Sequence, residues 1–436
     1  MTPPLTIEPP RAPVPAVGPA PLRPRRPQPP RRVDGALRFF GSYLTAATLL
    51  LVLMVIVAYG TFAQGWMSLF DVQRTYFAAW ITWLEFGAVR IPWPGGALAL
   101  TLLSLNLLLG GVIRMRKGMA TVGVLIAHLG ILLLFGGSLV ESLASDKGQM
   151  TLRAGETLDE FQAYDAWEIA VLERPAQGKA TEWVLPAARL DGLAPAQVAR
   201  FHHERLPFDV AVEGWQRSCE PRHGGTGAGV ATSVDGIVLQ DLPPATSSDA
   251  TNIPGCRVTL EPRAGGAPLR TLLWGGASIY GAGDGPRPWV ARVGGRRFEV
   301  DLRTRRFSLP FAIELTKFVH KEHPGTRMDS EFSSYVTKHE GGADREAHIT
   351  MNEPLRHAGY TFYQSGWGPR DAKPGERLFS TLAVVRNPSD RVPLLACLVI
   401  AAGLLLHFGR KLYLHVRAES SRAASNRAST SQGALR

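Results

Sequence analysis

The stretch that decides the fold is 119-MATVGVLIAHLGILLLFGGSLV-140, which carries no charged residue and a single histidine, His128. A helix that crosses a bilayer needs about 20 mostly apolar residues, so this stretch predicts a membrane-spanning helix. Three further stretches are similarly apolar, namely residues 37–63, 95–113 and 392–408. The sequence therefore predicts four transmembrane helices rather than the core of a soluble protein.

Basic residues flank these helices in a consistent pattern. They gather before the first helix, in the Arg114-Met-Arg116-Lys117 link between the second and third, and after the fourth. Short flanks rich in Lys and Arg stay on the cytoplasmic side of the membrane. We therefore expect both termini in the cytoplasm and residues 64–94 and 141–391 outside it. The formal net charge of +11 reflects this topology, so nucleic-acid binding is not expected.

Polar segments surround the apolar ones. Residues 1–36 are rich in Pro and Arg and have too little apolar area to fold, so a disordered tail is expected. Residues 409–436 are expected to form a second, basic cytoplasmic tail. In the outer loop 64–94, aromatic and aliphatic residues recur near helical spacing between Trp66 and Leu84, which predicts an amphipathic helix. That helix fits the membrane interface and a place under the outer domain equally well.

The large segment 141–391 is typical of a β-rich domain, such as a sandwich or a pair of sheets. Short apolar runs alternate with turn residues throughout it, as in antiparallel strands. The clearest hairpin has Gly294-Gly295 at its turn, where glycine supplies positive φ values. The expected strands are Trp167–Leu172, Phe208–Val212, Arg257–Leu260, Trp289–Val293, Phe298–Leu302, Phe311–Leu315, His348–Met351, Tyr360–Gln364 and Leu382–Val385.

Three cysteines occur in the chain. Cys397 falls within the fourth apolar segment, whereas Cys219 and Cys256 fall in the outer domain. An oxidising compartment would allow the last two to form a disulfide, so they are the candidate pair. No CxxC or CxxCH is present, which excludes a thioredoxin-type pair and a c-type haem attachment site within this chain. No soluble-enzyme motif is recognisable either, so no catalytic residue is predicted.

The unusual residue is His128 in the third apolar segment. An ionisable side chain at that depth is costly and usually faces a partner, a cavity or a cofactor. A neutral imidazole in apolar surroundings is also a good axial ligand for haem iron. The alternative is a histidine that is hydrogen-bonded to a neighbouring helix, for which Asn106 of the second segment is the candidate partner. Position alone leaves both interpretations open.

Several short motifs resemble a known family. The first apolar segment ends in Gly60-Thr-Phe-Ala-Gln64, and Ala127-His128-Leu-Gly130 lies in the third. The outer domain ends with Met351-Asn-Glu-Pro-Leu355 and Gly359-Tyr-Thr-Phe-Tyr-Gln-Ser365. With the four-helix topology, these motifs resemble the ResB family, also called CcsB, of cytochrome c biogenesis proteins. Residues 173–288 carry no motif of that kind.

The resemblance implies a function. ResB-like proteins and CcsA-like partners form a cytoplasmic-membrane complex that moves haem b outward and supports its attachment to CxxCH apocytochromes c. By resemblance, His128 matches the membrane histidine that ligates haem iron in transit, and the partner supplies the second axial ligand. The chain lacks the tryptophan-rich signature of CcsA, so it resembles the separate subunit, which is either non-catalytic or co-catalytic. The competing interpretation is a membrane-anchored sensor or scaffold with a β-type binding domain and no haem.

Overall fold

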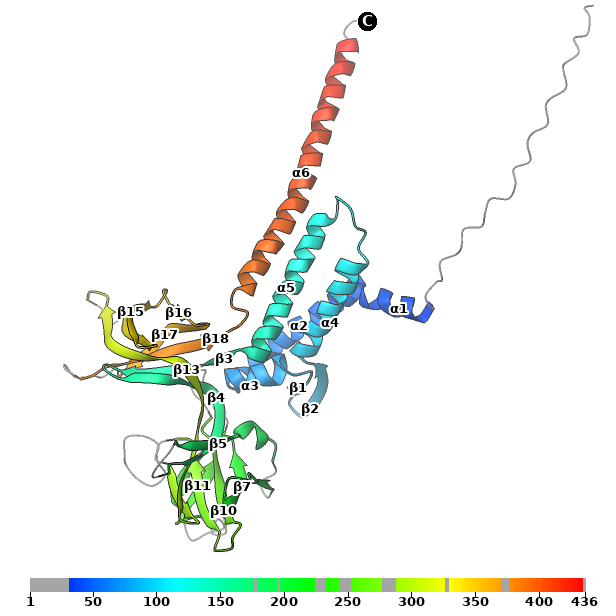
Figure 1. The fold of residues 1–436 in the computed structure, drawn as a ribbon. Helices are drawn as coiled ribbons and strands as arrows, with labels where there is room; N and C mark the ends of the chain where they lie inside the picture. Colours follow the sequence, from blue (N-terminus) through cyan, green and yellow to red (C-terminus); the bar gives the residue numbers. More distant parts are fainter. Residues whose placement is uncertain are drawn as a thin grey trace, which may run out of the picture.

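The computed structural model describes residues 31–175, 179–193, 197–223, 233–243, 252–276, 288–325, 329–369 and 376–433. Its helices and a large antiparallel β region form two distinct parts (Figure 1). The helical elements are α1 (Arg31–Phe40), α2 (Tyr43–Ala63), α3 (Leu69–Val72), the π-helix η1 (Gln73–Phe77), α4 (Gly96–Asn106), the π-helix η2 (Leu107–Ile113), α5 (Val122–Ala144), the 3-10 helix η3 (Ala187–Arg189) and α6 (Val392–Gly433).

Four helices in the described chain are long and apolar enough to cross a membrane. They are α2, α4 with η2, α5, and the first part of α6, and they coincide with the four predicted segments. The apolar length of these segments sets the helices, because only intrahelical hydrogen bonding satisfies the backbone in lipid. The predicted four-helix membrane class is therefore confirmed at the level of helix length and composition.

The N-terminal boundary differs from the prediction. Residues 1–30 of the expected disordered tail lie outside the described residues, but α1 begins at Arg31, so the expectation is wrong for 31–36. The first apolar segment is also broken between α1 and α2. At this break the side-chain amide of Asn106 donates to the carbonyls of Phe40 and Ser42, at 2.5 and 3.0 Å. A polar side chain on the second spanning helix therefore binds the backbone of the first spanning segment at its break.

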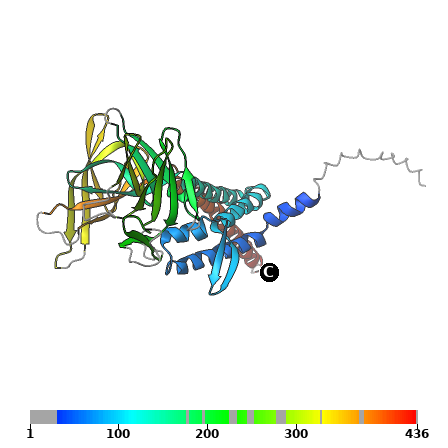
Figure 2. The same cartoon turned by 90° about the horizontal axis from the view of Figure 1, so that it is seen from below.

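The loop 64–94 is only partly helical. Leu69–Val72 and Gln73–Phe77 are helical, but Trp80 to Leu84 is not, because the strands β1 (Ile81–Phe86) and β2 (Val89–Pro94) form a hairpin there. This β1–β2 hairpin projects beside the helices (Figure 2). Burial alternates along β1, with Thr82 and Leu84 inside and Ile81 and Trp83 outside. That two-residue period is a strand signal, which the aromatic spacing of the sequence concealed.

The β region contains two units that share long strands. The strands are β3 (Asp146–Arg153), β4 (Thr157–Glu173), β5 (Thr181–Pro186), β6 (Val198–Phe201), β7 (Phe208–Gln216), β8 (Cys219–His223), β9 (Ile237–Asp241), β10 (Gly255–Pro262), β11 (Leu269–Trp274), β12 (Trp289–Val293), β13 (Arg296–Glu322), β14 (Asp329–Glu340), β15 (Ala343–Thr350), β16 (Leu355–His357), β17 (Tyr360–Gly368) and β18 (Phe379–Arg386). A ten-stranded sheet runs β15-β14-β13-β4-β3-β18-β17-β16, with β12 on β13 and β5 on β4. A four-stranded sheet runs β11-β10-β7-β6.

The β-strand predictions are confirmed. Each of the nine predicted runs lies in a strand, apart from Met351, which follows the end of β15. The Gly294-Gly295 turn has the expected positive φ values, 59° and 74°. Phe298–Leu302 and Phe311–Leu315 belong to a single strand, β13, which passes from one unit to the other (Figure 1).

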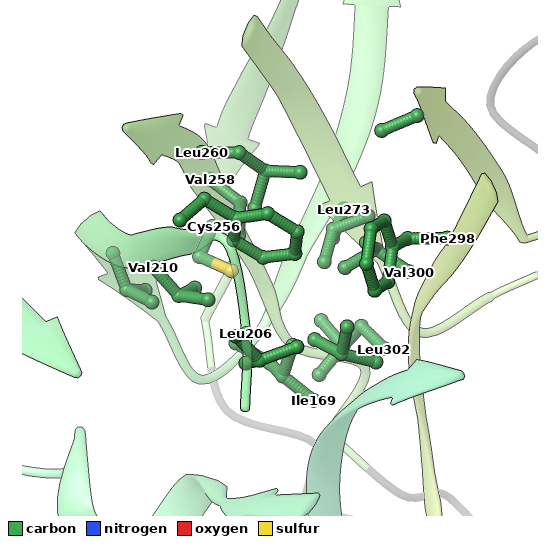
Figure 3. Close-up of a cluster of buried hydrophobic side chains, with 14 of the residues drawn as sticks. Ile169, Leu206, Val210, Cys256, Val258, Leu260, Leu273, Phe298, Val300 and Leu302 are labelled. Atoms are coloured by element: carbon green, nitrogen blue, oxygen red, sulfur yellow. The ribbon is translucent and has the colours of Figure 1, made fainter. Parts of the chain in front are cut away.

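Each β unit has its own hydrophobic core. The unit nearer the helices includes Phe161, Ile313 and Phe362, all essentially inaccessible. The farther unit packs Phe208 edge-on against Phe298, with ring centroids 4.9 Å apart, inside a larger aliphatic cluster (Figure 3). Burial of such side chains contributes roughly 1.5–3 kcal/mol each. The β domain is therefore held together by two cores, which β4 and β13 connect.

Candidate functional site

The spanning helices place His128 near one end of α5. It lies six residues after Val122 and sixteen before Ala144, hence about 9 Å and about 24 Å from the two helix ends at 1.5 Å per residue. Counted over the apolar run 119–140, His128 would lie near the middle, but the helix begins at Val122 and ends at Ala144. The imidazole therefore lies toward the end of α5 that is remote from the β domain.

Three glycines on α5 face the neighbouring helix α6. A side chain at Gly123 would meet the Gly403 carbonyl of α6 at 2.6 Å, and one at Gly137 would meet Val392 at 2.5 Å. Gly130 approaches α6 in the same way, at Ile400. These three glycines of α5 are therefore covered by α6 of the same chain. Gly136, in contrast, has no neighbour within 4 Å among the described residues.

The His128 ring faces the second spanning helix. Its Nδ1 lies 2.9 Å from the Gly111 carbonyl of η2. A carbonyl can only accept, so this hydrogen bond requires the proton on Nδ1 and leaves the lone pair on Nε2. In the described part of the chain, Nε2 makes no hydrogen bond. The alternative interpretation, a hydrogen bond to the second spanning segment, is thus present in the structure. Its candidate partner Asn106 is wrong, since that side chain binds Phe40 and Ser42 instead.

A neutral histidine in this state is suited to bind a metal. Metal ligation uses the unprotonated ring nitrogen, and a carbonyl on the other nitrogen fixes the tautomer and orientation. The described residues contain no group of three or more His, Cys, Asp or Glu side chains that could hold a metal ion by themselves. Through Nε2, the His128 imidazole can supply one ligand to a metal ion.

The two outer cysteines are free thiols in the structure. Cys256 is completely buried in the core of the farther β unit (Figure 3), and the Cys219 sulfur faces Gly255. Burial raises the pKa of the Cys219 thiol to about 12 and also raises the pKa of Cys256. Both are protonated at neutral pH and so are poor nucleophiles. The candidate disulfide between Cys219 and Cys256 is thus not formed in this structure.

The short helix α3 joins the membrane helices to the outer domain. Asp71 is 6% exposed and accepts from Arg217 at 2.5 Å and from Asn252 at 3.2 Å. Burial opposes ionisation of Asp71, but hydrogen bonds from Arg217 and Ser68 outweigh it and lower the pKa. Leu69–Val72 therefore contacts the β domain through Asp71.

A cavity of about 300 Å³ lies at this junction. Trp167 and Trp215 line its outer-domain side, while Phe70 and Arg74 line it from the helices. The Arg74 guanidinium lies 3.3 Å from the Asp165 carboxylate across the junction. Sequence reasoning missed these residues, because the paired groups are far apart in the chain and no local pattern connects them.

The fold and the His128 site together define an integral-membrane class of protein, in which apolar helices carry an antiparallel β domain and an intramembrane histidine. A family model described as the ResB-like family matches residues 290–376. A comparison with curated proteins found no match. The matched residues run from β12 through β17 and include the Met351–Leu355 and Gly359–Ser365 motifs. The predicted ResB-like resemblance is thereby confirmed in this part of the outer domain, and it implies involvement in cytochrome c biogenesis.

Proposed function

We propose that this chain is the ResB-like subunit of a cytochrome c maturation complex, in which His128 holds haem iron while haem b crosses the membrane. The observation that carries the proposal is the His128 ring, with Nδ1 bound to a backbone carbonyl at 2.9 Å and Nε2 without a hydrogen bond in the described structure. The ResB-like match supports the same pathway from a separate part of the chain.

Haem is the cargo of this site rather than a resident cofactor. The chain's own contribution is to orient one imidazole in an apolar environment through the hydrogen bond to Gly111. One imidazole fills one axial position, so release of haem requires breaking a single bond to this chain. No described residue of the chain is assigned to the thioether addition itself, so we infer a supporting role in that step.

The place of His128 suits entry of haem from the cytoplasm. The Arg114 guanidinium donates to the Leu37 carbonyl at 3.0 Å, and Gly123 packs against His407. One end of the helices thus holds the basic flanks. It contains the beginning of the first span, the 114–117 link and the part of α6 around His407. Because basic flanks favour the cytoplasmic side, His128 would lie in the cytoplasmic half of the bilayer and the β domain outside.

This orientation predicts the result of reporter fusions. Fusions after Arg116 and after Arg417 should be active only as cytoplasmic reporters, because basic flanks are retained inside. Fusions after Ala144 and near Gly265 should be active only as external reporters. Paired cytoplasmic and external reporters at each position provide the control, and an external signal at Arg116 would contradict the four-span orientation.

A partner is required to complete the iron coordination. Affinity purification of the tagged chain in mild detergent, from cells that make c-type cytochromes, should recover a CcsA-like membrane protein together with haem. Pyridine haemochrome spectroscopy measures the haem, and mass spectrometry identifies the partner. If the purified chain carries neither haem nor a CcsA-like protein, and so gives the same result as a tagged control protein, the haem-free sensor or scaffold is favoured instead.

A further inference from the structure

The carbonyl that meets His128 belongs to an irregular turn. Leu107–Ile113 forms a π-helix, and within it the Arg114 amide bonds to the Leu109 carbonyl five residues back. Such turns are rare and often occur at functional sites. The His128 Nδ1 binds the Gly111 carbonyl of this turn at 2.9 Å. The hydrogen bond that the ring makes in the described structure is thus to the backbone of η2.

Gly111 has no room for a side chain. A Cβ placed there would lie 2.6 Å from the His128 Nδ1 and 3.1 Å from its Cε1. These distances are well below van der Waals contact, so alanine at this position would push the ring away. The ring and the turn can approach closely only because residue 111 is glycine.

The η2 turn is also packed on the side opposite the His128 ring, so it cannot easily move away from the ring. On its other side, a Cβ at the adjacent Gly110 would meet the Gly41 carbonyl at 2.6 Å. Gly41 lies at the break between α1 and α2, which Asn106 holds through hydrogen bonds to Phe40 and Ser42. The turn is therefore clamped between the first spanning segment and α5, which fixes the position of its carbonyl.

We propose that Gly111 is a positioning residue for haem ligation, and this inference rests on the proposed role of His128. The Gly111 carbonyl holds the imidazole in the tautomer that is protonated on Nδ1, so that Nε2 presents its lone pair to the iron. Hydrogen-bond partners of this kind raise ligand basicity, and their loss typically costs about 10- to 100-fold in metal affinity.

The Gly111→Ala variant tests this role with His128 intact. We expect about 10-fold or greater weakening of haem binding by the purified complex, together with a changed reduction potential of the bound haem. Gly409→Ala is the control, because Gly409 also lies in a spanning helix but has no neighbour within 4 Å among the described residues. Unchanged haem affinity and potential in Gly111→Ala would overturn the proposal.

Rescue of a His128→Gly variant by free imidazoles tests the hydrogen bond to the Gly111 carbonyl separately from the steric effect of an alanine side chain at position 111. In His128→Gly, imidazole and 4-methylimidazole can both ligate iron and donate an N–H to the Gly111 carbonyl, whereas 1-methylimidazole can ligate but not donate. We expect the first two to restore the six-coordinate haem spectrum at about 10-fold lower concentration. In the double variant His128→Gly/Gly111→Ala, the difference in concentration between 1-methylimidazole and the other two imidazoles should be smaller.

The outcomes distinguish the two hypotheses. If His128→Gly retains wild-type haem without any added imidazole, the proposed haem role of His128 fails. If it loses haem and all three imidazoles restore the spectrum equally, the haem role stands and the Gly111 proposal is overturned. If no imidazole enters, the affinity and reduction potential of Gly111→Ala, measured against Gly409→Ala, decide for or against Gly111.

Discussion

Replacing His128 with alanine should lower the haem that copurifies with the complex by about tenfold or more, since loss of even a ligand's hydrogen-bond partner costs about 10- to 100-fold in metal affinity. The protein should still insert, because alanine has the highest helix propensity and removes an ionisable group from the apolar segment. Cytochrome c maturation should fall in parallel. Haem per mole of purified complex, from pyridine haemochrome spectra and protein quantification, gives the result directly.

Two further variants sharpen the test of His128. His128→Cys should restore part of the haem, because thiolate is another axial ligand. His407→Ala is the matched control, since His407 is also a half-buried histidine in a spanning helix. Its ring contacts Phe408 and makes no hydrogen bond in the described structure. An unchanged haem ratio in His128→Ala would end the ligand hypothesis, and so would an equal loss in His407→Ala. A purely structural histidine would instead reduce abundance and leave haem per surviving molecule normal.

Replacing Gly123 with leucine should strongly destabilise the pairing of α5 with α6. A side chain there would meet the Gly403 carbonyl at 2.6 Å and the His407 backbone nitrogen at 2.7 Å, and backbone cannot rotate aside. Overpacking typically costs about 1–3 kcal/mol and occasionally more. The midpoint of thermal unfolding of the purified chain in detergent should therefore fall.

Gly136→Leu is the control for this helix pair. It introduces the same side chain into the same helix, but Gly136 has no neighbour within 4 Å in the described chain. Its unfolding midpoint in the isolated chain should match the wild type. Equal midpoints for Gly123→Leu and Gly136→Leu would show that α5 and α6 do not pack as described.

Much of the fold follows from local sequence patterns. Apolar length alone predicts the four spanning helices, because lipid leaves the backbone few alternatives to a helix. Alternation and turn residues predict the nine strands, because side chains of a half-buried strand face opposite sides in turn. The same patterns fail at Trp80–Leu84, where aromatic spacing suggests a helix and burial against α2 and η1 selects a hairpin.

The features of the candidate site likewise follow partly from the sequence and partly from the tertiary structure. The sequence by itself determined that His128 is an ionisable group in an apolar helix, and it predicted a role for this residue from the resemblance of Ala127-His128-Leu-Gly130 to a ResB-family motif. Only the tertiary structure decided its partner, the Gly111 carbonyl rather than Asn106, and that α6 covers the glycine face of α5. The physical reason is that periodicity records which side of a helix is apolar, whereas hydrogen-bond partners depend on how separate helices are packed.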